Sequence, residues 1–283
     1  ASLVDGRSYL DEGFVKISLV DFSLNYPSEI VLNTIENPTP ADGALFGSSI
    51  FVSKSTDTNK LLLVGAPGQN LVYSYEFTAS TSTATVTLVD TISSANGSFG
   101  ASISGTANGD MYAISAPNTS IGTTATIGTV YVYGDIEQTI VPPSICEAGD
   151  KFGSSILMSD DGAYLFVAST VAGNVIGSNG KVFVYKNTGT QYTLTQTLNN
   201  PSQGVEFGVS MSVDSTNKTL VVTSRGNAAS SSISFDNGTT TFDSGSCDIV
   251  LLSKNSGNVF TFNRINEMFI FAEELQSGLT VND

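Results

Sequence analysis

The sequence predicts an all-β fold built from four copies of one unit, and three observations support this. First, a phenylalanine-glycine pair recurs at Phe46, Phe99, Phe152 and Phe207, with steps of 53, 53 and 55 residues. Second, only 13% of the residues are charged, and no helical periodicity of any length occurs. Third, each unit holds short segments rich in β-branched residues. Such small sheets are apolar on both faces and must stack, so we predict a β-propeller of four-stranded antiparallel blades.

Residues 1–45 are predicted to form the outer half of a preceding blade, followed by a linker. Val15–Leu19 alternates as a strand, Asn25-Tyr26-Pro27 is typical of a turn, and Glu29–Ile35 is a second strand. The inner hairpin of this half-blade has no counterpart in the sequence. Because unpaired strand edges invite association, we expect four complete blades within a larger ring or longer chain, or a neighbouring chain that supplies the missing strands.

Residues 46–98 and 99–151 are the first two complete blades of this prediction. The strands expected in them are Gly47–Val52, Leu61–Gly65, Val72–Tyr75, Thr85–Ile92, Met111–Ser115, Val130–Tyr133 and Thr139–Val141. Polar or glycine-containing segments separate these strands, as the turns between antiparallel neighbours require.

Residues 152–206 and 207–283 are the third and fourth blades. The strands expected in them are Tyr164–Ala168, Val182–Tyr185, Tyr192–Leu198, Thr219–Thr223, Val259–Phe262 and Met268–Leu275. The fourth blade also carries an insertion at about 227–247 that is rich in Ser, Thr, Asp and Gly. Long insertions on a regular scaffold tend to carry function, so we expect this segment to form a contact surface.

The pattern within a unit also predicts how each blade is arranged. The most hydrophobic segment is the second strand, which we place innermost in the blade. In the Val-Tyr-x-Tyr segments the aromatic side chains share one face, because side chains alternate along a strand. The glycine after each repeated phenylalanine is expected to allow close approach of a neighbouring backbone.

The repeated units resemble the FG-GAP repeat over residues 46–275. The motifs that carry the resemblance are Phe46-Gly47-Ser48-Ser49-Ile50 and its three copies, Val64-Gly65-Ala66-Pro67, Ser115-Ala116-Pro117 and Gly128–Tyr133. That family includes the seven-bladed propellers of integrin α subunits and many repeat proteins of microbes and algae. The later units depart from it, because Val167-Ala168-Ser169 and Val222-Thr223-Ser224 replace the Gly-Ala-Pro element.

Composition narrows the classes of function. The net charge of −15, with 11 basic residues, would repel a phosphate backbone, so we expect no nucleic-acid partner. No apolar run approaches the roughly 20 residues of a membrane span, so we expect no membrane insertion. The absence of His removes the commonest acid–base side chain, and the absence of Trp removes the preferred platform for stacking sugars. On these grounds we expect no enzymatic activity.

Calcium is the one cofactor that the resemblance implies, through Asp-rich loops between the first two strands of a blade. The matching loops here contain Asp57 and Asn59, Asn108 and Asp110, Asp160 and Asp161, and Asp214 and Asn217. None has three alternating acidic positions, and ordinary polar turns also account for these residues. If calcium binds, we expect Asp160 and Asp161 to be its ligands.

Two cysteines form a candidate disulfide. Cys146 lies in the loop that enters the third blade, and Cys247 lies in the insertion of the fourth. In a propeller these loops open on the same face of neighbouring blades, so a disulfide between them is geometrically possible. It requires that the two Cα atoms come within about 7 Å of each other. Free thiols, or links to other chains, are the alternatives.

Four asparagines begin Asn-x-Ser/Thr sequons and are candidates for glycosylation. They are Asn96, Asn118, Asn217 and Asn237. All four lie in predicted loops, where a glycan could be accommodated.

Together these observations predict a non-enzymatic, extracellular or surface-exposed propeller that acts as a structural, assembly and protein-binding module. A filament, a virion tail or a fibre would be the large assembly, because strand donation between copies would complete the open blade. The alternative is an adhesion or receptor ectodomain within a longer chain, with or without calcium. The expected partners are proteins or copies of the chain itself, and glycans are an alternative class of partner.

Overall fold

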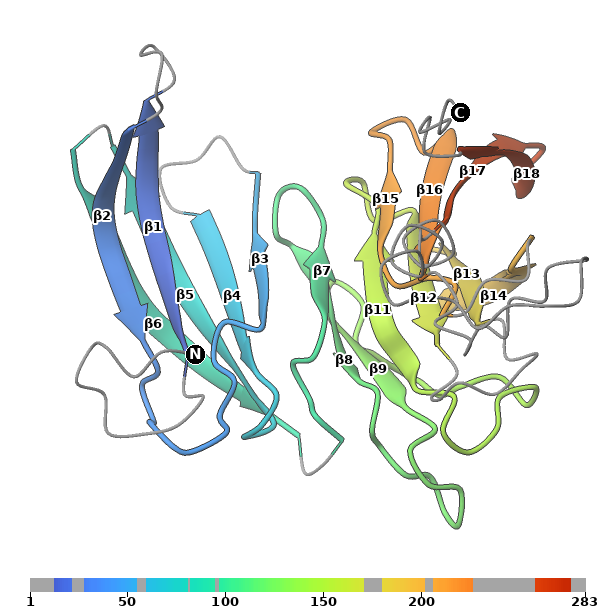
Figure 1. Ribbon diagram of the computed structural model, residues 1–283, viewed down its shortest axis with the longest axis horizontal. Coiled ribbons are helices and arrows are strands. Elements are labelled where there is room, and N and C mark those ends of the chain that lie inside the picture. The colour runs from blue at the N-terminus through green and yellow to red at the C-terminus, as the bar shows by residue number, and fades with distance from the viewer. Residues whose placement is uncertain are drawn as a thin grey trace, which may run out of the picture.

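The computed structural model describes residues 13–21, 28–54, 60–80, 82–94, 97–170, 180–201, 206–225 and 258–275. Within these ranges the chain is all-β and contains no helix (Figure 1). The strands are β1 (Phe14–Asp21), β2 (Ser28–Glu36), β3 (Ser49–Val52), β4 (Lys60–Ala66), β5 (Leu71–Ala79), β6 (Ala84–Ser93), β7 (Ile103–Gly105), β8 (Met111–Ala116), β9 (Thr129–Gly134), β10 (Gln138–Ile140), β11 (Phe152–Met158), β12 (Tyr164–Ser169), β13 (Lys181–Asn187), β14 (Tyr192–Asn199), β15 (Met211–Val213), β16 (Thr219–Ser224), β17 (Asn258–Ile265) and β18 (Met268–Leu275).

Within each sheet of the described residues, strands that follow one another in the sequence pair with one another, and these pairs are antiparallel. β3–β6, β7–β10, β11–β14 and β15–β18 form four-stranded sheets, and β1 pairs with β2 in a separate two-stranded sheet. This topology confirms the predicted all-β class and its four-stranded antiparallel units. The described strands do not close into a ring, because β1–β2 lies at one end of the molecule and β15–β18 at the other (Figure 1).

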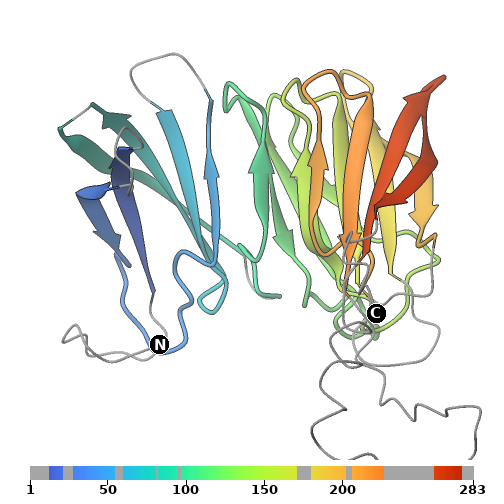
Figure 2. The same cartoon turned by 45° about the horizontal axis from the view of Figure 1, so that its top comes forward.

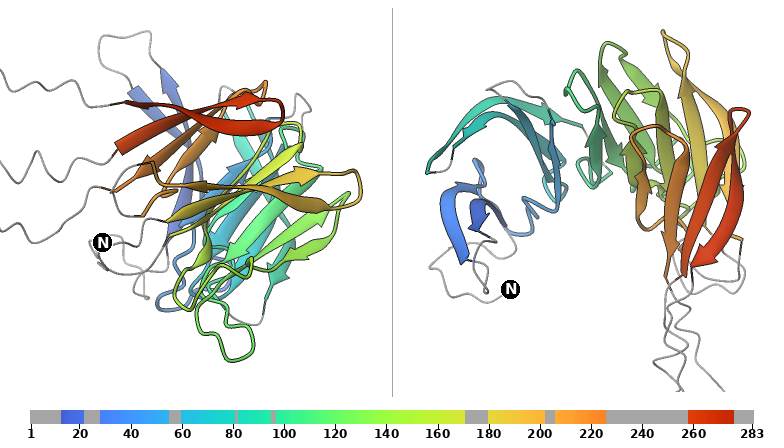
Figure 3. Two further views of the ribbon diagram at one scale, coloured as in Figure 1. Left: turned by 90° about the vertical axis from the view of Figure 1, so that its right-hand side faces the viewer. Right: turned by 90° about the horizontal axis from the view of Figure 1, so that it is seen from above.

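The inner edge of each sheet differs from the prediction. The first strands β3, β7, β11 and β15 contact one another in sequence, so they form the inner edge of the arc (Figure 3). The second strands lie between the first and the third strands, which buries Leu63, Ile114 and Leu165 completely. Placing the second strand innermost was therefore wrong. Its hydrophobicity reflects neighbours on both edges and both faces.

The hydrophobic core lies between neighbouring sheets. Each repeated phenylalanine packs against its own sheet and against the sheet before it; Phe152, for example, meets Val130 of β9 and Leu165 of β12 in one cluster. The β1–β2 sheet follows the same arrangement, since Val15 and Ile35 share a cluster with Phe46. The sheets are thus held together by four similar apolar seams, which we call the Phe-Gly seams.

The geometry of these seams repeats closely. The ring of each Phe-Gly phenylalanine lies 5.5 to 5.6 Å from the first aromatic ring of the third strand in its own sheet. The pairs are Phe46–Tyr73, Phe99–Tyr131, Phe152–Phe183 and Phe207–Phe260. Edge-on and tilted pairs of this kind stabilise a core beyond the area that they bury.

The glycine of each seam allows the close approach that the sequence predicted. Gly208, with φ of +96°, lies where an added Cβ would stand 2.7 Å from the Cβ of Ala168 in the preceding sheet. At Gly100 an added Cβ would stand 2.8 Å from the carbonyl oxygen of Leu71. Gly47 also has a positive φ, of 83°, and β3 begins at Ser49 and not at the predicted residue 47.

The sheets have two ends that carry different turns (Figure 2). At one end lie the turns that follow the first and third strands of each sheet, and we call this the first-hairpin face. At the other end lie the turns that follow the second strands, together with the connections between sheets; we call this the opposite face. No helix of the described residues is long and apolar enough to cross a membrane.

Candidate functional site

Hydrogen bonds link the turns of the first-hairpin face from sheet to sheet. The Lys54 amide donates to the carbonyl oxygen of Ala107 at 2.7 Å, and the Ala107 amide donates to the carbonyl oxygen of Asp160 at 2.9 Å. The Lys54 Nζ atom also reaches the Asp160 carboxylate at 2.6 Å. Three successive turns are therefore joined in a row along the inner edge.

Asp161 continues this row to the fourth sheet. Its carboxylate accepts hydrogen bonds from Ser159 Oγ at 2.7 Å, from the Ala163 amide at 2.9 Å and from Asn217 Nδ2 at 2.8 Å. Burial acts to raise the pKa of Asp161, but these hydrogen bonds outweigh it and lower the pKa. The other end of the Asn217 amide, Oδ1, is buried without a hydrogen-bond partner among the described residues.

A charged cluster lies where the third and fourth sheets meet on this face. Glu267 accepts hydrogen bonds from Lys186 Nζ at 2.6 Å and from the Tyr164 hydroxyl at 2.9 Å. Arg264 Nη1 donates to the same hydroxyl at 2.9 Å and lies 3.5 Å from Glu267. The Arg264 guanidinium also lies 5.4 Å from the centre of the Tyr164 ring, as in a cation–π contact.

The cluster fixes the charges of its members. Hydrogen bonds from Lys186 and then from Tyr164 lower the pKa of Glu267, so that this carboxylate is ionised at neutral pH. The same bond to Glu267 raises the pKa of Lys186, and the bond to Tyr164 raises the pKa of Arg264. Two cations, Lys186 and Arg264, thus share the ionised carboxylate of Glu267, and the nearby charge of Asp161 also raises the pKa of Arg264.

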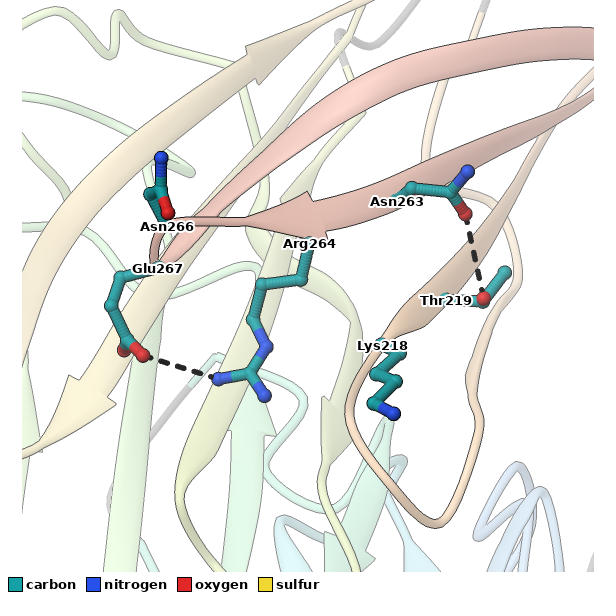
Figure 4. Close-up of a pocket in the computed structure, with 6 residues that line it drawn as sticks. All are labelled: Lys218, Thr219, Asn263, Arg264, Asn266 and Glu267. Carbon is teal, nitrogen blue, oxygen red and sulfur yellow. Dashed lines mark hydrogen bonds and ion pairs between the residues drawn. The ribbon is translucent and has the colours of Figure 1, made fainter.

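A pocket of about 520 Å³ opens beside this cluster, between the β15–β16 turn and the β17–β18 hairpin (Figure 4). We call it the cationic pocket; it is lined by Lys218, Thr219, Asn263, Arg264, Asn266 and Glu267. The side chains of Lys218 and Arg264 extend to the same side of the hairpin, whereas Asn266 points away (Figure 4). Lys218 is exposed and makes no ion pair with another described residue.

This local charge contrasts with the rest of the chain. The protein has 11 basic residues and a net charge of −15, yet Lys186, Lys218 and Arg264 gather here, and Glu267 is the one carboxylate among the six residues that line the pocket. Two further carboxylates lie near the pocket: Asp214, which accepts a hydrogen bond from the Lys218 amide, and Asp161, whose charge acts on Arg264. A concave site with an excess of one charge sign raises the local concentration of ions of the other sign. The arrangement can bind an anion of small-molecule size, and Glu267 places a carboxylate base beside it.

The predicted calcium ligands lie on the same face but are already engaged. Asp160 faces Lys54, and both oxygens of Asp161 accept hydrogen bonds from protein groups. Among the described residues no three His, Cys, Asp or Glu side chains form a group that could hold a metal ion. Asp57 and Asn59 lie outside the described residues. Calcium binding at Asp160 and Asp161 stays a prediction.

The cysteine prediction also stays open. Cys146 is buried, and burial raises the pKa of its thiol to about 11, with a further contribution from the nearby charge of Asp150. It forms no disulfide with another described residue. Cys247, like the rest of the insertion at 227–247, lies outside the described residues.

The glycosylation candidates occupy different environments. Asn118 is exposed, and its Nδ2 atom donates to Ser98 Oγ at 2.9 Å. Asn217 is only 5% exposed, and a glycan on its Nδ2 atom would displace the hydrogen bond to Asp161. Asn96 and Asn237 lie outside the described residues.

Sequence reasoning missed every residue of the cationic pocket. One signal was available: Arg264 and Glu267 both lie among the five residues between the predicted strands Val259–Phe262 and Met268–Leu275, so they had to share a hairpin. Lys218 precedes the strand that pairs with the Arg264 strand, which places it at the same end of the sheet. Tyr164 and Lys186 come from the neighbouring sheet, and only the tertiary structure brings them to Glu267.

No protein-family model and no curated protein sequence match the chain. Solved structures with a similar fold include a putative 6-phosphogluconolactonase from Bacteroides fragilis NCTC 9343, with a TM-score of 0.53 and 14% identity over 92% of this chain and 65% of that chain. A putative 6-phosphogluconolactonase from Bacteroides uniformis ATCC 8492 has a TM-score of 0.53 and 12% identity, over 92% of this chain and 68% of that chain. The periplasmic gluconolactonase PpgL from Pseudomonas aeruginosa has a TM-score of 0.50 and 13% identity, over 88% of this chain and 60% of that chain. At these identities the likeness shows the fold, which is that of β-propellers.

These comparisons correct the predicted function. We expected a non-enzymatic assembly module, or an adhesion or receptor ectodomain, but the solved structures with a similar fold carry the names of enzymes, two putative 6-phosphogluconolactonases and a periplasmic gluconolactonase. The expectation failed because it treated the absence of His as evidence against catalysis. Carboxylates also transfer protons, and Arg, Lys and Tyr also stabilise developing charge. None of these neighbours is an FG-GAP repeat protein, so that resemblance stays a prediction.

Proposed function

We propose that the chain is a propeller hydrolase that opens the lactone ring of an anionic sugar acid at the cationic pocket. The observation that carries the proposal is the pairing of Lys218 and Arg264 with the ionised carboxylate of Glu267 in one pocket. The names of the structural neighbours, two of which specify a phosphorylated substrate, support the choice of substrate class.

The chemistry needs only groups that the pocket supplies. A water molecule adds to the lactone carbonyl carbon, the bond from that carbon to the ring oxygen breaks, and the ring oxygen takes up a proton. The product is an open-chain hydroxy acid. Glu267 would accept the proton of the attacking water and pass it to the ring oxygen as the carbon–oxygen bond breaks, and a cation beside it would stabilise the negative charge that develops on the carbonyl oxygen.

Each cation has its own part in this proposal. Arg264 is held by Tyr164 and lies next to Glu267, so it is placed to stabilise the oxyanion. Lys218 has no ion pair with a described residue and lies across the pocket, so it is placed to bind the phosphate or carboxylate of the substrate. Lys186 and Tyr164 act as positioning residues, because both hold the Glu267 side chain by hydrogen bonds.

The rate of acid release from 6-phosphoglucono-1,5-lactone, followed in a pH-stat against the spontaneous reaction, tests this function. We expect the protein to exceed the spontaneous rate, and Glu267→Gln to lower kcat by roughly 100-fold. Glu273→Gln is the matched control, because Glu273 is an exposed glutamate of β18, the strand that follows the turn of Glu267, and lies outside the pocket. A rate equal to the spontaneous one would overturn the proposal, and so would an unchanged kcat in Glu267→Gln.

We further propose that the four sheets are consecutive blades of a larger FG-GAP-like ring outside the cytoplasm. The repeated seam geometry supports the blade assignment, and the periplasmic neighbour and the acidic composition support the location. A crystal structure that shows the number of blades around the axis tests the first statement. Fractionation of the native cells tests the second, and recovery in the cytoplasm would contradict it.

A further inference from the structure

A second concave site lies on the opposite face, away from the cationic pocket. This cleft, of about 600 Å³, lies between the first two four-stranded sheets, where the β4–β5 turn, the β6–β7 connection and the loop after β8 meet. We call it the polar cleft; its lining includes Asn70, Ser94, Ser98, Asn118, Thr119 and Tyr131. Its volume falls within the range of about 300–1,000 Å³ that is common for small-ligand sites.

The chemistry of the polar cleft is unlike that of the cationic pocket. Among the described residues that line it, the polar side chains are alcohols, amides and one phenol, without a carboxylate, an ammonium or a guanidinium group. In a chain with 26 acidic residues, a site of this size without a carboxylate stands out. An anion would find no counter-charge here, and a metal cation would find no anionic ligand.

The two amides of the polar cleft are held in fixed orientations. Asn70 Oδ1 accepts a hydrogen bond from the Phe99 amide at 3.2 Å, so Asn70 offers its NH₂ group. Asn118 Nδ2 donates to Ser98 Oγ at 2.9 Å, so Asn118 offers its carbonyl oxygen. One strong donor and one strong acceptor therefore line the same cleft, and their hydrogen bonds to the protein reduce the side-chain freedom that ligand binding would otherwise remove.

The backbone is also shaped to keep this site together. Gly97 has φ of +96°, and a Cβ at this position would stand 2.1 Å from Thr119 Oγ1, so only glycine lets the two loops approach so closely. The Tyr131 ring is held edge-on against Phe99 at 5.5 Å, and its hydroxyl accepts a hydrogen bond from Ser94 at 3.4 Å. The half-exposed ring adds an aromatic surface to the polar groups.

The corresponding position between the β1–β2 sheet and the β3–β6 sheet is closed by hydrogen bonds within the protein. There the Thr39 hydroxyl is hydrogen-bonded to the Tyr73 hydroxyl, Asn37 Nδ2 donates to Gln69 Oε1 at 3.0 Å, and Gln69 Nε2 donates to the Thr39 carbonyl oxygen at 2.7 Å. The polar groups of that position satisfy one another. Those of the polar cleft leave a donor and an acceptor for a ligand.

We propose that the polar cleft binds a neutral saccharide. Vicinal sugar hydroxyls both donate and accept, which matches the fixed NH₂ of Asn70, the carbonyl oxygen of Asn118 and the hydroxyls around them. The C–H face of a sugar ring suits the apolar surface of Tyr131. This inference is independent of the lactone hydrolase, because the two sites lie at opposite ends of the sheets and share no residue.

Affinity gel electrophoresis of the full chain, produced without glycosylation, in gels containing dextran, laminarin, mannan or xylan tests the proposal. We expect at least one of these neutral polysaccharides to retard the protein. The double variant Ser94→Ala/Tyr131→Phe removes two hydroxyls of the cleft and should raise the apparent Kd for the polysaccharide roughly tenfold or more. Thr39→Val/Tyr73→Phe makes the same chemical change at the closed position and should leave binding unchanged.

Thermal unfolding of both double variants shows whether they are folded, and Asn118→Ala gives a second variant that leaves the aromatic ring in place. Absence of retardation by all four polysaccharides would overturn the proposal. The proposal would also be overturned if Ser94→Ala/Tyr131→Phe and Asn118→Ala both kept the wild-type affinity for the polysaccharide. It would likewise be overturned if an unrelated peptide digest competed with the polysaccharide for binding. Loss of lactone hydrolysis with saccharide binding retained would affect only the proposed function.

Discussion

The four Phe-Gly seams closely resemble one another, whereas the turns on the two faces of the molecule differ from one sheet to the next. The seams repeat four times with ring distances of 5.5 to 5.6 Å, and with glycines whose φ values lie between +83° and +96°. The two faces, by contrast, differ from sheet to sheet: the first-hairpin face carries a charged cluster at the third and fourth sheets, and the opposite face carries a closed hydrogen-bonded set at one position and an open polar cleft at the next. The seams set the fold, and the turns are free to carry binding and catalysis because they contribute little to it.

The largest effect should come from emptying a seam. Phe152 is fully buried and packs against Phe183 at 5.6 Å and Tyr185 at 6.4 Å. Phe152→Ala should therefore lower the free energy of unfolding by about 3–5 kcal/mol, measured by urea denaturation. Leu88→Ala is the control, since Leu88 is 44% exposed and its truncation should cost about 1 kcal/mol. Similar losses in the two variants would break the contrast between seam and surface.

A smaller but sharper effect should follow from adding one methyl group to a seam. Gly208 and Gly189 have φ values of 96° and 92°, but only at Gly208 would a Cβ meet a neighbour within 4 Å. Gly208→Ala should cost about 2–4 kcal/mol, because backbone strain adds to the clash with Ala168. Gly189→Ala carries the strain alone and should cost about 1 kcal/mol. Equal destabilisation in thermal unfolding would show that close packing at the glycine is unimportant.

The faces should respond to salt where the seams do not. Raising the ionic strength screens the attraction between the exposed Lys218 and an anionic substrate. Going from 0.05 to 0.5 M salt should therefore lower kcat/KM for 6-phosphoglucono-1,5-lactone by roughly tenfold, and should change kcat/KM for the neutral glucono-1,5-lactone little. A parallel decline for both lactones would argue against recognition of the phosphate by the cationic pocket.

The smallest effect concerns pH and the turn that presents Lys218. The Thr216 hydroxyl and then the Thr219 amide donate to Asp214 and lower its pKa to about 2. Because the pKa is lower in the folded protein than in the unfolded chain, the ionised Asp214 stabilises the fold above about pH 4. This contribution is lost as the pH falls from about 4 through 2.

Asp214→Asn removes that ionisation. The midpoint of thermal unfolding should fall by about 1 °C at neutral pH, and its decline between pH 4 and 2 should become shallower, since Asp214 is almost fully exposed. Asp110→Asn, in the corresponding turn of the second sheet, is the matched control. An unchanged pH profile in Asp214→Asn would mean that the turn does not depend on this carboxylate.

Much of the fold could be predicted because its causes are local in the sequence. The alternating segments gave the strands, and the recurring Phe-Gly pair gave the repeat and the close approach at glycine. The inner edge was assigned to the wrong strand, since hydrophobicity reports burial and does not report distance from the axis. Leu63 of the second strand is fully buried, whereas Ile50 of the innermost first strand is 45% exposed.

The candidate sites could not be predicted in the same way, because they join residues that lie far apart in the sequence. Tyr164 and Glu267 are separated by 103 positions and meet only when the third and fourth sheets pack together. The polar cleft depends on the orientation of the Asn70 and Asn118 amides, which is decided by hydrogen bonds to Phe99 and Ser98. Residue types alone do not reveal which of several similar turns remains open.

The measurement that tests the account most directly is a paired one on Lys218→Gln, of its thermal midpoint and of its rate of 6-phosphoglucono-1,5-lactone hydrolysis. Lys54→Gln removes a charge from the same face outside the pocket and serves as the control. We predict that Lys218→Gln shifts the midpoint by no more than about 2 °C and lowers kcat/KM roughly tenfold, whereas Lys54→Gln leaves kcat/KM unchanged. Equal kcat/KM values in wild type and Lys218→Gln would contradict the assignment of function to this pocket.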